Sequence, residues 1–346
     1  MRIECWSITG NGFHFGQHGL GQEKTSLTMP SDSLFAALVA RLVALEGKQA
    51  VERFTAPFCS GDPPFVLSST FPFAGQVRFF PPPVRSGQGG SSATSAKQLK
   101  KVKFVSEDLF RQLLAGAALV ELYPAAAALQ NGAVLVSQAE LTKLPPAIRQ
   151  QGKPVWANEI RPRVTLGRAA QNSTAFATGR VSYAPGCGMW FGVRWLRSEA
   201  GLPELLATVL RELGDAGLGA ERNAGFGACQ IEPAGELELP QATGKPWLNL
   251  SRYLPRPDEL SALKDPRAAY TLVNVGGWLD SPVLRGQRRR PVNLITAGSV
   301  LGPLERQAPG QVVDVRPSYA ADPDPLKHPV LRCGLALAVG IEGCEP

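Results

Sequence analysis

The chain has 346 residues and a net charge of +7, which favours an anionic partner. Its length predicts two domains. No G-K-[ST] tripeptide is present, which excludes a P-loop, and no apolar run approaches 18 residues, which argues against a membrane span. We therefore expect a soluble, cytoplasmic protein without a membrane partner.

The cysteines give no sign of a metal site. Most of them lie in apolar, strand-like runs, and no C-x-x-C pair is present. Such a distribution is typical of buried, reduced thiols rather than of zinc ligands or disulfides. The sequence therefore predicts no metal and no cofactor. The cysteines are Cys5, Cys59, Cys187, Cys229, Cys333 and Cys344.

The chain begins with a strand and a glycine-rich loop. Residues 2–9 carry apolar side chains on both faces, which predicts a strand buried on much of both sides. The loop at residues 10–24 contains His14, Phe15 and Lys24. Aromatic rings can stack on the bases of single-stranded RNA, and a lysine can contact phosphate. A solvated flexible loop is an equally good interpretation.

A helix is predicted next. Apolar residues recur at helical spacing over residues 34–45, and Ser31 or Asp32 can cap the N-terminus. The N-terminus of this helix offers free N–H groups and the positive end of the dipole, which makes it a candidate phosphate seat. The alternative is that Ser31 serves only as a cap.

The following region interrupts the regular pattern. Residues 65–73 read as a strand, and the proline triplet at residues 81–83 stops it. A low-complexity stretch at residues 86–96 precedes a cluster of lysines, and residues 107–122 look helical. The lysines are either a solvated charge run or an arm that follows RNA. They are Lys97, Lys100, Lys101 and Lys103.

Arginines mark the next strands. Residues 156–166 predict a strand with Arg161 and Arg163 on one face, and Arg168 follows it. Two further runs, at residues 176–183 and 189–196, are joined by A-P-G-C-G. This arrangement predicts a hairpin between those two runs, with Arg180 on its first strand.

The most distinctive motif connects a helix to a strand. After a helix predicted at residues 203–213, the chain reads G-D-A-G-L-G-A-E-R-N-A-G-F-G-A-C-Q. Free amides in such a loop can form an anion-binding concavity, and a central arginine suits phosphate. A glycine-rich turn with no ligand is the alternative, and the spacing is not that of a dinucleotide fingerprint. The candidate ligands are Gly217, Gly219, Arg222, Asn223, Gly225 and Gly227.

The order of elements predicts an α+β fold. Strand, helix, two strands, helix and strand form the βαββαβ arrangement of a ferredoxin-like domain. We assign it to residues 1–240, with an insertion at about residues 81–158 and the Gly-rich loop at residues 214–227. Residues 250–346 predict a second, degenerate ferredoxin-like domain. It contains a basic turn at residues 285–291, for which a solvated loop is the ordinary explanation.

These stretches together resemble a known family. The chain is similar to the CRISPR RAMP superfamily, and specifically to the type III-A (Csm) effector subunit that holds the 5′ end of the guide RNA. The matching stretches occur in order along nearly the whole chain. Besides the first strand, they are F-H-F-G at 13–16, P-S-D-S-L-F-A-A-L at 30–38, S-S-T-F-P-F at 68–73, K-K-V-K-F at 100–104, R-P-R-V-T-L-G-R at 161–168, T-G-R-V at 178–181, G-M-W-F at 188–191, G-L-G-A-E-R-N-A-G-F-G at 217–227, G-G-W at 276–278, A-G-S-V at 297–300 and H-P-V-L-R-C-G-L-A at 328–336.

The resemblance implies a non-catalytic RNA-binding subunit with two ferredoxin-like domains. Such subunits bind the repeat-derived 5′ tag of the crRNA, dock onto a large polymerase-palm-like subunit that makes cyclic oligoadenylates, and abut a backbone RAMP subunit. A thumb-like hairpin displaces one nucleotide of the guide, and residues 81–158 or 176–196 are the candidates here. The sequence departs from the family at Gly167 and near Pro82 and Pro83, and it lacks an aromatic RNP motif.

Three functions follow from this reasoning. The leading hypothesis is a crRNA 5′-tag-binding and scaffolding subunit of a type III-A CRISPR interference complex. The second is a metal-independent endoribonuclease in which His14 or His18 acts as general acid or base. The third is a protein-docking module without RNA contact. The predicted RNA-binding residues are His14, Phe15, Lys24, Ser31, Arg161, Arg163, Arg168, Arg180, Gly217, Gly219, Arg222, Asn223, Gly225 and Gly227.

Overall fold

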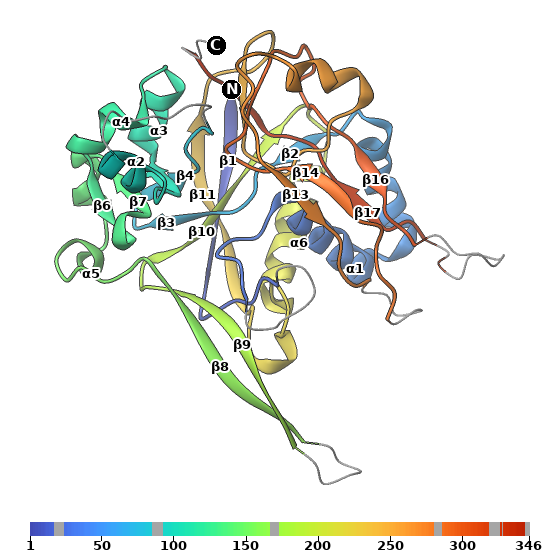
Figure 1. The fold of residues 1–346 in the computed structure, drawn as a ribbon. Helices are drawn as coiled ribbons and strands as arrows, with labels where there is room; N and C mark the ends of the chain where they lie inside the picture. Colours follow the sequence, from blue (N-terminus) through green and yellow to red (C-terminus); the bar gives the residue numbers. More distant parts are fainter. Residues whose placement is uncertain are drawn as a thin grey trace.

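The computed structural model describes residues 1–16, 24–84, 93–166, 173–279, 286–317, 326 and 328–342. Figure 1 shows a mixed α+β protein in which one large sheet runs through the body and several small sheets pack beside it. This confirms the predicted α+β class. His18, Gly167 and Arg168, which the sequence singled out, lie outside the described residues.

The first strand lies inside the large sheet, between two strands that come much later in the sequence. β1 (Arg2–Gly10) pairs antiparallel with β10 (Cys187–Trp195) on one side and with β11 (Cys229–Glu238) on the other. Ile3, Cys5, Trp6 and Ile8 of β1 are buried, as its two-faced apolar pattern predicts. The predicted strand at residues 65–73 is divided into β2 (Phe65–Leu67) and β3 (Phe71–Ala74), both paired with β10.

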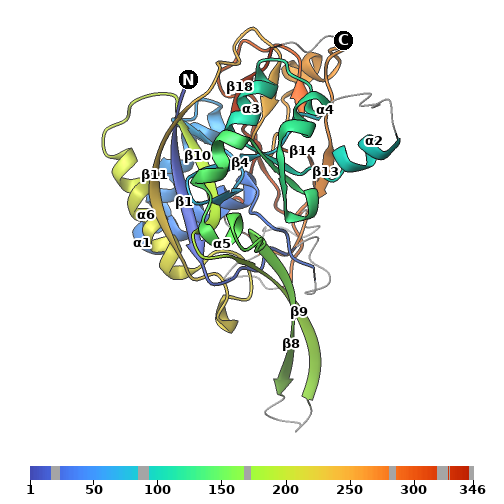
Figure 2. The same cartoon turned by 90° about the vertical axis from the view of Figure 1, so that its left-hand side faces the viewer.

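Two helices cover one face of these strands. α1 (Ser31–Ser60) and α6 (Leu202–Ala216) lie side by side in Figure 2, and Arg41 of α1 pairs with Glu212 of α6 at 2.8 Å. α1 is longer than the predicted helix because it continues past a kink at Gly47, whose φ is 79°. The predicted order of strand, helix, two strands, helix and strand is therefore present in β1, α1, β2 with β3, β10, α6 and β11.

The insertion extends the large sheet and carries short helices. Strand order continues from β3 through β4 (Val77–Phe80), β5 (Phe104–Ser106) and β7 (Val134–Val136) to β6 (Ala127–Leu129). The predicted helical stretch at residues 107–122 is confirmed by α3 and α4. The helices of this lobe are α2 (Ala93–Leu99), α3 (Glu107–Leu114), α4 (Leu119–Leu122), α5 (Pro146–Arg149) and the 3-10 turns η1 (Tyr123–Ala125), η2 (Gln130–Gly132) and η3 (Gln138–Lys143).

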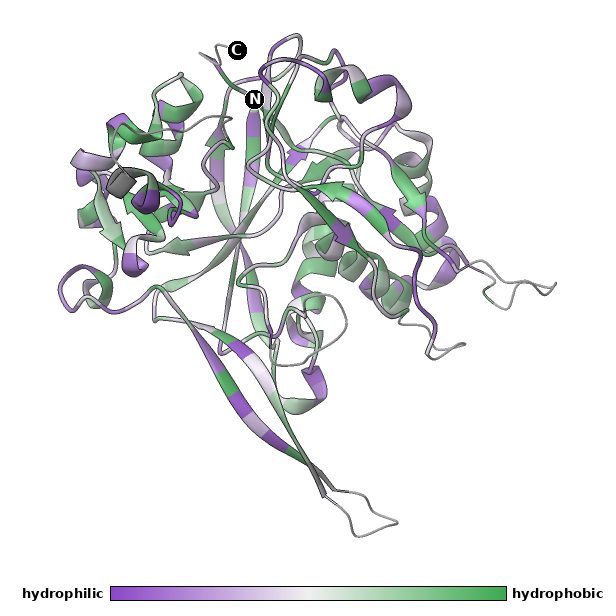
Figure 3. Cartoon of the chain, viewed as in Figure 1, coloured by the Kyte–Doolittle hydropathy of each residue, from purple (hydrophilic) through white to green (hydrophobic). Residues whose placement is uncertain are grey.

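A two-stranded arm projects from the body (Figure 1). β8 (Trp156–Leu166) pairs with β9 (Ser173–Tyr183) in an unbroken antiparallel register from Trp156↔Tyr183 to Leu166↔Ser173. In Figure 3 hydrophilic and hydrophobic residues alternate along it. We call this hairpin the β8–β9 arm.

The sequence prediction of a hairpin between residues 176–183 and 189–196 is wrong. β9 pairs with β8, whereas β10 enters the large sheet between β1 and β2 with β3. The reason is burial, because almost every residue of β10 is buried and needs sheet neighbours on both sides. The A-P-G-C-G segment at residues 184–188 therefore joins the arm to the sheet rather than closing a hairpin.

The C-terminal part consists of short strands. After residue 240 the described residues contain one helical segment, the 3-10 helix η5 (Pro257–Leu263). Its strands form small sheets of two or three strands. They are β12 (Trp247–Asn249), β13 (Leu272–Val275), β14 (Val292–Ile295), β15 (Val300–Leu301), β16 (Val312–Asp314), β17 (Leu331–Cys333) and β18 (Ala338–Gly340).

The two parts share one hydrophobic core. Leu248, Leu335 and Leu337 of the C-terminal part belong to the same cluster of buried residues as Leu34 of α1 and Val193 of β10. A smaller cluster around Trp247, Tyr253 and Ile295 lies within the C-terminal part. Burial of apolar surface between the two parts therefore stabilises their relative position.

Candidate nucleic-acid interface

The Gly-rich loop is closed by contacts with the loop after β1. Gly227 N donates to Gly12 O at 2.9 Å, and Ala220 N donates to His14 O at 2.9 Å. A Cβ on Gly219 would lie 2.4 Å from His14 O, and one on Gly227 would lie 2.3 Å from Leu218 O. Because both glycines also have φ near 90°, they are required here for backbone approach as well as for conformation.

This packing takes up part of the predicted cradle of free amides. The amides of six loop residues donate to carbonyl groups of the protein, so they are not available to an anion. They belong to Leu218, Ala220, Ala224, Gly225, Phe226 and Gly227. Arg222 and Asn223, in the 3-10 turn η4 (Arg222–Ala224), remain exposed at the tip of the loop. Gly217 ends α6 with φ at 85°.

The β8–β9 arm is tied to the Gly-rich loop by Phe226, through Arg180 near the base of the arm and Arg163 farther along it. The Arg163 guanidinium lies over the Phe226 ring at 4.6 Å from its centroid, and Arg163 Nη2 donates to Ala224 O at 3.0 Å. The Arg180 guanidinium lies 5.9 Å from the same centroid and donates to Asn11 O. Phe226 is 8% exposed. We call Arg163, Arg180 and Phe226 the arm clamp, and its cation–π contacts hold arm and loop together.

The arm clamp carries surplus donors and one acidic neighbour. The Nε groups of Arg163 and Arg180 are buried and have no hydrogen-bond partner within the described ranges. Arg161 donates to Glu159 Oε2 from Nε at 2.9 Å and from Nη2 at 2.6 Å. Arg180 Nη1 lies 3.7 Å from the same carboxylate. Glu159 therefore orders two arginines and neutralises part of their charge.

His14 and Phe15 are buried instead of lining an open loop. His14 is 4% exposed, and its Nδ1 lies 2.7 Å from Gly179 O, to which the ring N–H donates a hydrogen bond. Phe15 is 5% exposed and stacks on Phe13 at 5.4 Å. The predicted stacking of a base on Phe15 is therefore wrong, because the ring is used for packing. Lys24 is exposed.

The predicted phosphate seat at the start of α1 is also wrong. Ser31 is 4% exposed, its Oγ accepts from Arg252 N at 2.8 Å, and its N donates to Ser69 Oγ at 3.1 Å. Ser31 is not the cap either, since Pro30 occupies that position without a side-chain hydrogen bond. Asp32 forms a buried ion pair with Arg332 of β17. The C-terminal part therefore covers this helix end.

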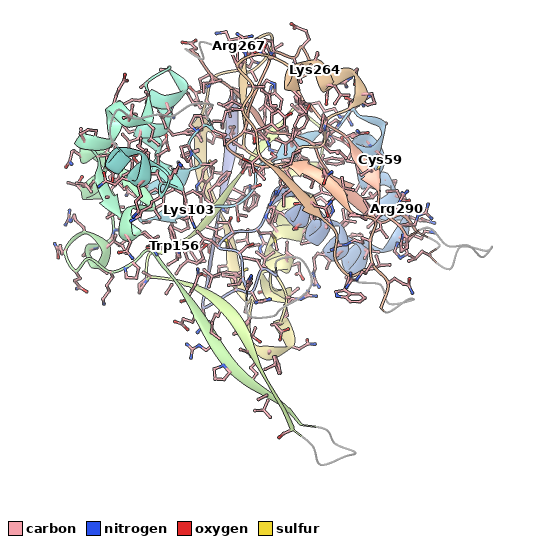
Figure 4. The ribbon with its side chains drawn as sticks, viewed as in Figure 1. Cys59, Lys103, Trp156, Lys264, Arg267 and Arg290 are labelled. Carbon is pink, nitrogen blue, oxygen red and sulfur yellow. The ribbon has the colours of Figure 1, made fainter. Side chains whose placement is uncertain are left out.

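Exposed lysines lie on the insertion lobe. Lys97, Lys100, Lys101 and Lys103 are exposed, while Leu99 and Val102 between them are buried. Phe104 contacts Trp156 at the base of β8 with ring centroids 6.0 Å apart, and Figure 4 shows Lys103 and Trp156 beside each other. Lys103 therefore lies beside the base of the arm, whereas α2, which carries Lys97, lies away from the arm in Figure 2.

Sequence reasoning found the arginines but missed what organises them. Phe226 was noted only as part of the G-F-G stretch, and Glu159 and the Asn11 carbonyl were not considered. A phenylalanine between two glycines in a loop next to strands with arginines is the signal that would have indicated a cation–π clamp.

The described residues contain no group of three or more His, Cys, Asp and Glu side chains that could hold a metal. No helix in these ranges is long and apolar enough to cross a membrane. Cys5, Cys59, Cys187, Cys229 and Cys333 are free thiols. Burial raises the pKa of Cys5 to about 11 and that of Cys187 and Cys229 to about 12, so these thiols stay protonated near neutral pH.

Comparisons with known proteins agree along the chain. Residues 242–341 match the CRISPR Csm4 C-terminal domain. Over 306 residues the chain is 27% identical to the CRISPR system Cms protein Csm4 of Mycobacterium tuberculosis, covering 87% of this chain and 88% of the relative. Over 326 residues it is 25% identical to the protein of that name from Thermococcus onnurineus, covering 90% and 91%.

Solved structures share the fold. A chain in the crystal structure of the Csm3-Csm4 subcomplex in the type III-A CRISPR-Cas interference complex superimposes with a TM-score of 0.66 at 15% identity, covering 99% of this chain and all of that chain. A chain in the Csm1-Csm4 cassette in complex with cA3 superimposes with a TM-score of 0.58 at 18% identity, covering 100% of both.

Proposed function

Family and fold together support a Csm subunit of the type III-A CRISPR system, and on that premise we propose that this chain is the non-catalytic subunit that binds the 5′ tag of the crRNA and scaffolds the interference complex. Relatives of known structure occur in complexes with Csm3 and with Csm1. We accordingly propose a backbone RAMP subunit and a large polymerase-palm-like subunit as partners, in the cytoplasm.

The observation that carries the proposal is the arm clamp beside an exposed loop tip. Arg163 and Arg180 hold the Gly-rich loop against the β8–β9 arm through Phe226, and this leaves Arg222 and Asn223 exposed. A planar guanidinium donates in a fork that fits phosphate oxygens. We assign phosphate contact to Arg222 and Arg161, with Arg163 and Arg180 positioning the loop.

The β8–β9 arm is our candidate for the thumb that displaces a guide nucleotide. It lies at residues 156–183 and overlaps the end of one range considered from the sequence, 81–158, and the start of the other, 176–196. Its face opposite Arg161 and Arg163 exposes Ile160 and Val164, at 66% and 60%. Aliphatic side chains on a rigid projecting hairpin can fill the space left by an unstacked base.

We further propose that the N-terminal part is a ferredoxin-like RAMP domain. The order β11-β1-β10 with β2 and β3 beyond it, all antiparallel, and both helices on one face fit that fold. The endoribonuclease alternative has less support, since His14 is 4% exposed and its Nδ1 bonds the Gly179 carbonyl. A general base needs access to its substrate.

The test is crRNA occupancy in the assembled complex. We expect Arg222→Glu, co-expressed with the partner subunits and a crRNA, to reduce bound crRNA per complex at least tenfold. Arg211→Glu is the matched control, because Arg211 is also exposed and lies on α6 next to the loop. Subunit ratios measured on the same samples show whether assembly is intact. Unchanged occupancy with Arg222→Glu would refute the proposed contact.

Two further measurements separate the competing functions. When single-stranded RNA binds through its phosphates, the logarithm of the binding constant falls with the logarithm of the salt concentration with a slope of about −0.7 per contact. A module that only docks onto other proteins would show no such salt-dependent binding of RNA. Cleavage of repeat RNA that disappears in His14→Ala would establish the endoribonuclease and overturn the non-catalytic assignment.

A further inference from the structure

A second exposed surface lies on the C-terminal part, away from the arm clamp. Trp278 and Arg288 face each other across a β-bridge that continues the β13–β14 ribbon. The Arg288 guanidinium lies over the Trp278 ring at 4.7 Å from its centroid. Trp278 is 48% exposed, a large value for the largest of the aromatic side chains.

Exposed side chains of β13 precede this pair along the ribbon. Residues two apart on a strand point the same way, so Leu272 and Asn274 lie on one side of β13, and Trp278 follows after the strand ends at Val275. Leu272 is 57% exposed. Asn274 Nδ2 donates to Asn293 Oδ1 at 2.8 Å across the register. We call Leu272, Asn274, Asn293, Trp278 and Arg288 the Trp278 face.

The charge around this face is strongly one-sided. Residues 268–304 contain four arginines and a single acidic residue, Asp280, which makes a net charge of +3 out of +7 for the whole chain. Arg290, labelled in Figure 4, is exposed on the same ribbon and donates from Nη2 to Asp314 O at 2.5 Å. This excess of positive charge therefore favours a polyanion as the ligand of this region.

The position of the β13–β14 ribbon is compatible with an RNA strand that continues from the arm clamp. Both ribbon views show β13 and β14 running toward the end of the molecule from which the β8–β9 arm projects (Figures 1 and 2). A single strand that leaves the loop tip can therefore pass toward the C-terminal part on the same side of the protein.

We propose that the Trp278 face binds single-stranded RNA, with one base stacked on Trp278 and the adjoining phosphate on Arg288. An exposed tryptophan beside an arginine in a basic region is the combination that single-strand binders use, and stacking tolerates any base. The two asparagine amides add donors and acceptors for base edges. The inference deepens the proposed function and rests on it only for the identity of the strand, which would be the guide RNA.

The experiment measures binding of a fluorescein-labelled single-stranded RNA 20-mer to the full chain by anisotropy at several salt concentrations. Loss of one stacked base is expected to weaken binding about fivefold to 150-fold in Trp278→Ala. Trp278→Phe should restore most of the affinity, because phenylalanine also stacks. Leu260→Ala is the control, since Leu260 is another exposed apolar residue, 46% accessible, on η5. Thermal melts establish that each variant is folded.

The salt slope separates the two assigned roles. Arg288→Ala should make the log–log slope shallower by about 0.7, whereas Trp278→Ala should leave the slope unchanged while lowering affinity. If the affinity of Trp278→Ala for the RNA is within twofold of that of the wild-type chain, the proposal is overturned. If RNA binding is unchanged but Trp278→Ala no longer assembles with the partner subunits, the face is a protein interface and the proposal is also overturned.

This outcome is independent of the test on the loop. A loss with Trp278→Ala and none with Arg222→Glu would support the Trp278 face and refute the proposed tag contact. The reverse result would refute the Trp278 face and leave the proposed function standing.

Discussion

The buried ion pair between Asp32 and Arg332 is expected to hold the two parts of the chain together. Arg332 Nη1 bonds Asp32 Oδ2, and the two side chains are 4% and 1% exposed. The residues lie 300 positions apart, at the start of α1 and in β17. Asp32 Oδ1 and Arg252 Nη1 are buried without partners among the described residues. The carboxylate is therefore poorly solvated and depends on Arg332.

Replacing Arg332 by Met should be strongly destabilising. Removing one member of a buried pair leaves an uncompensated charge and costs about 3–5 kcal/mol. Nearby Arg252, whose pKa is lowered by burial and raised by Asp32, still compensates part of that charge, so we expect the lower half of this range. With an unfolding entropy of about 2.1 cal/mol/K per residue, this cost corresponds to a fall in Tm of about 4–6 °C.

The assay is thermal unfolding followed by circular dichroism at pH 7.5. The double variant Asp32→Leu, Arg332→Met removes both charges and should regain most of the lost Tm, because a packed apolar pair is often as stable as a buried ion pair. Asp62→Ala is the control: it breaks the exposed pair with Arg197, in which Asp62 is 78% exposed, and should cost less than about 1 kcal/mol. Equal losses for Arg332→Met and Asp62→Ala, or a double variant less stable than Arg332→Met, would refute the reasoning.

Two further predictions concern the loop glycines and the thiols. Gly219→Ala should lower Tm more than Gly225→Ala. Both glycines have φ above 80°, but a Cβ on Gly219 would lie 2.4 Å from a backbone oxygen, whereas a Cβ on Gly225 would meet open space. Equal melting temperatures for the two variants would contradict the close-approach argument. At pH 8, iodoacetamide should label exposed Cys59 well before Cys5, Cys187 and Cys229. Burial raises the pKa of Cys5 to about 11 and those of Cys187 and Cys229 to about 12, which leaves little thiolate on these three residues. Peptide mass spectrometry measures the order of labelling, and early labelling of Cys187 would show that its thiol is not buried.

The sequence by itself determined the elements and the family resemblance. The apolar pattern of residues 2–9 predicted a strand buried on both faces, and the helical spacing at residues 203–213 predicted α6. It also identified Arg161, Arg163, Arg180 and the Gly-rich loop as candidate RNA-binding features, without indicating which residues contact them. These features depend on residues close together in the chain, and local periodicity reports them directly.

Only the tertiary structure decided which elements meet. β9 pairs with β8 while β10 pairs with β1, Ser31 and Asp32 are covered by Arg252 and Arg332, and two amides of the Gly-rich loop donate to the loop after β1. The contacts of β10, of the start of α1 and of these two amides join residues far apart in sequence. Strand partners and hydrogen-bond acceptors are selected by total burial across the whole molecule, and a pattern read over a few residues contains no information about that competition.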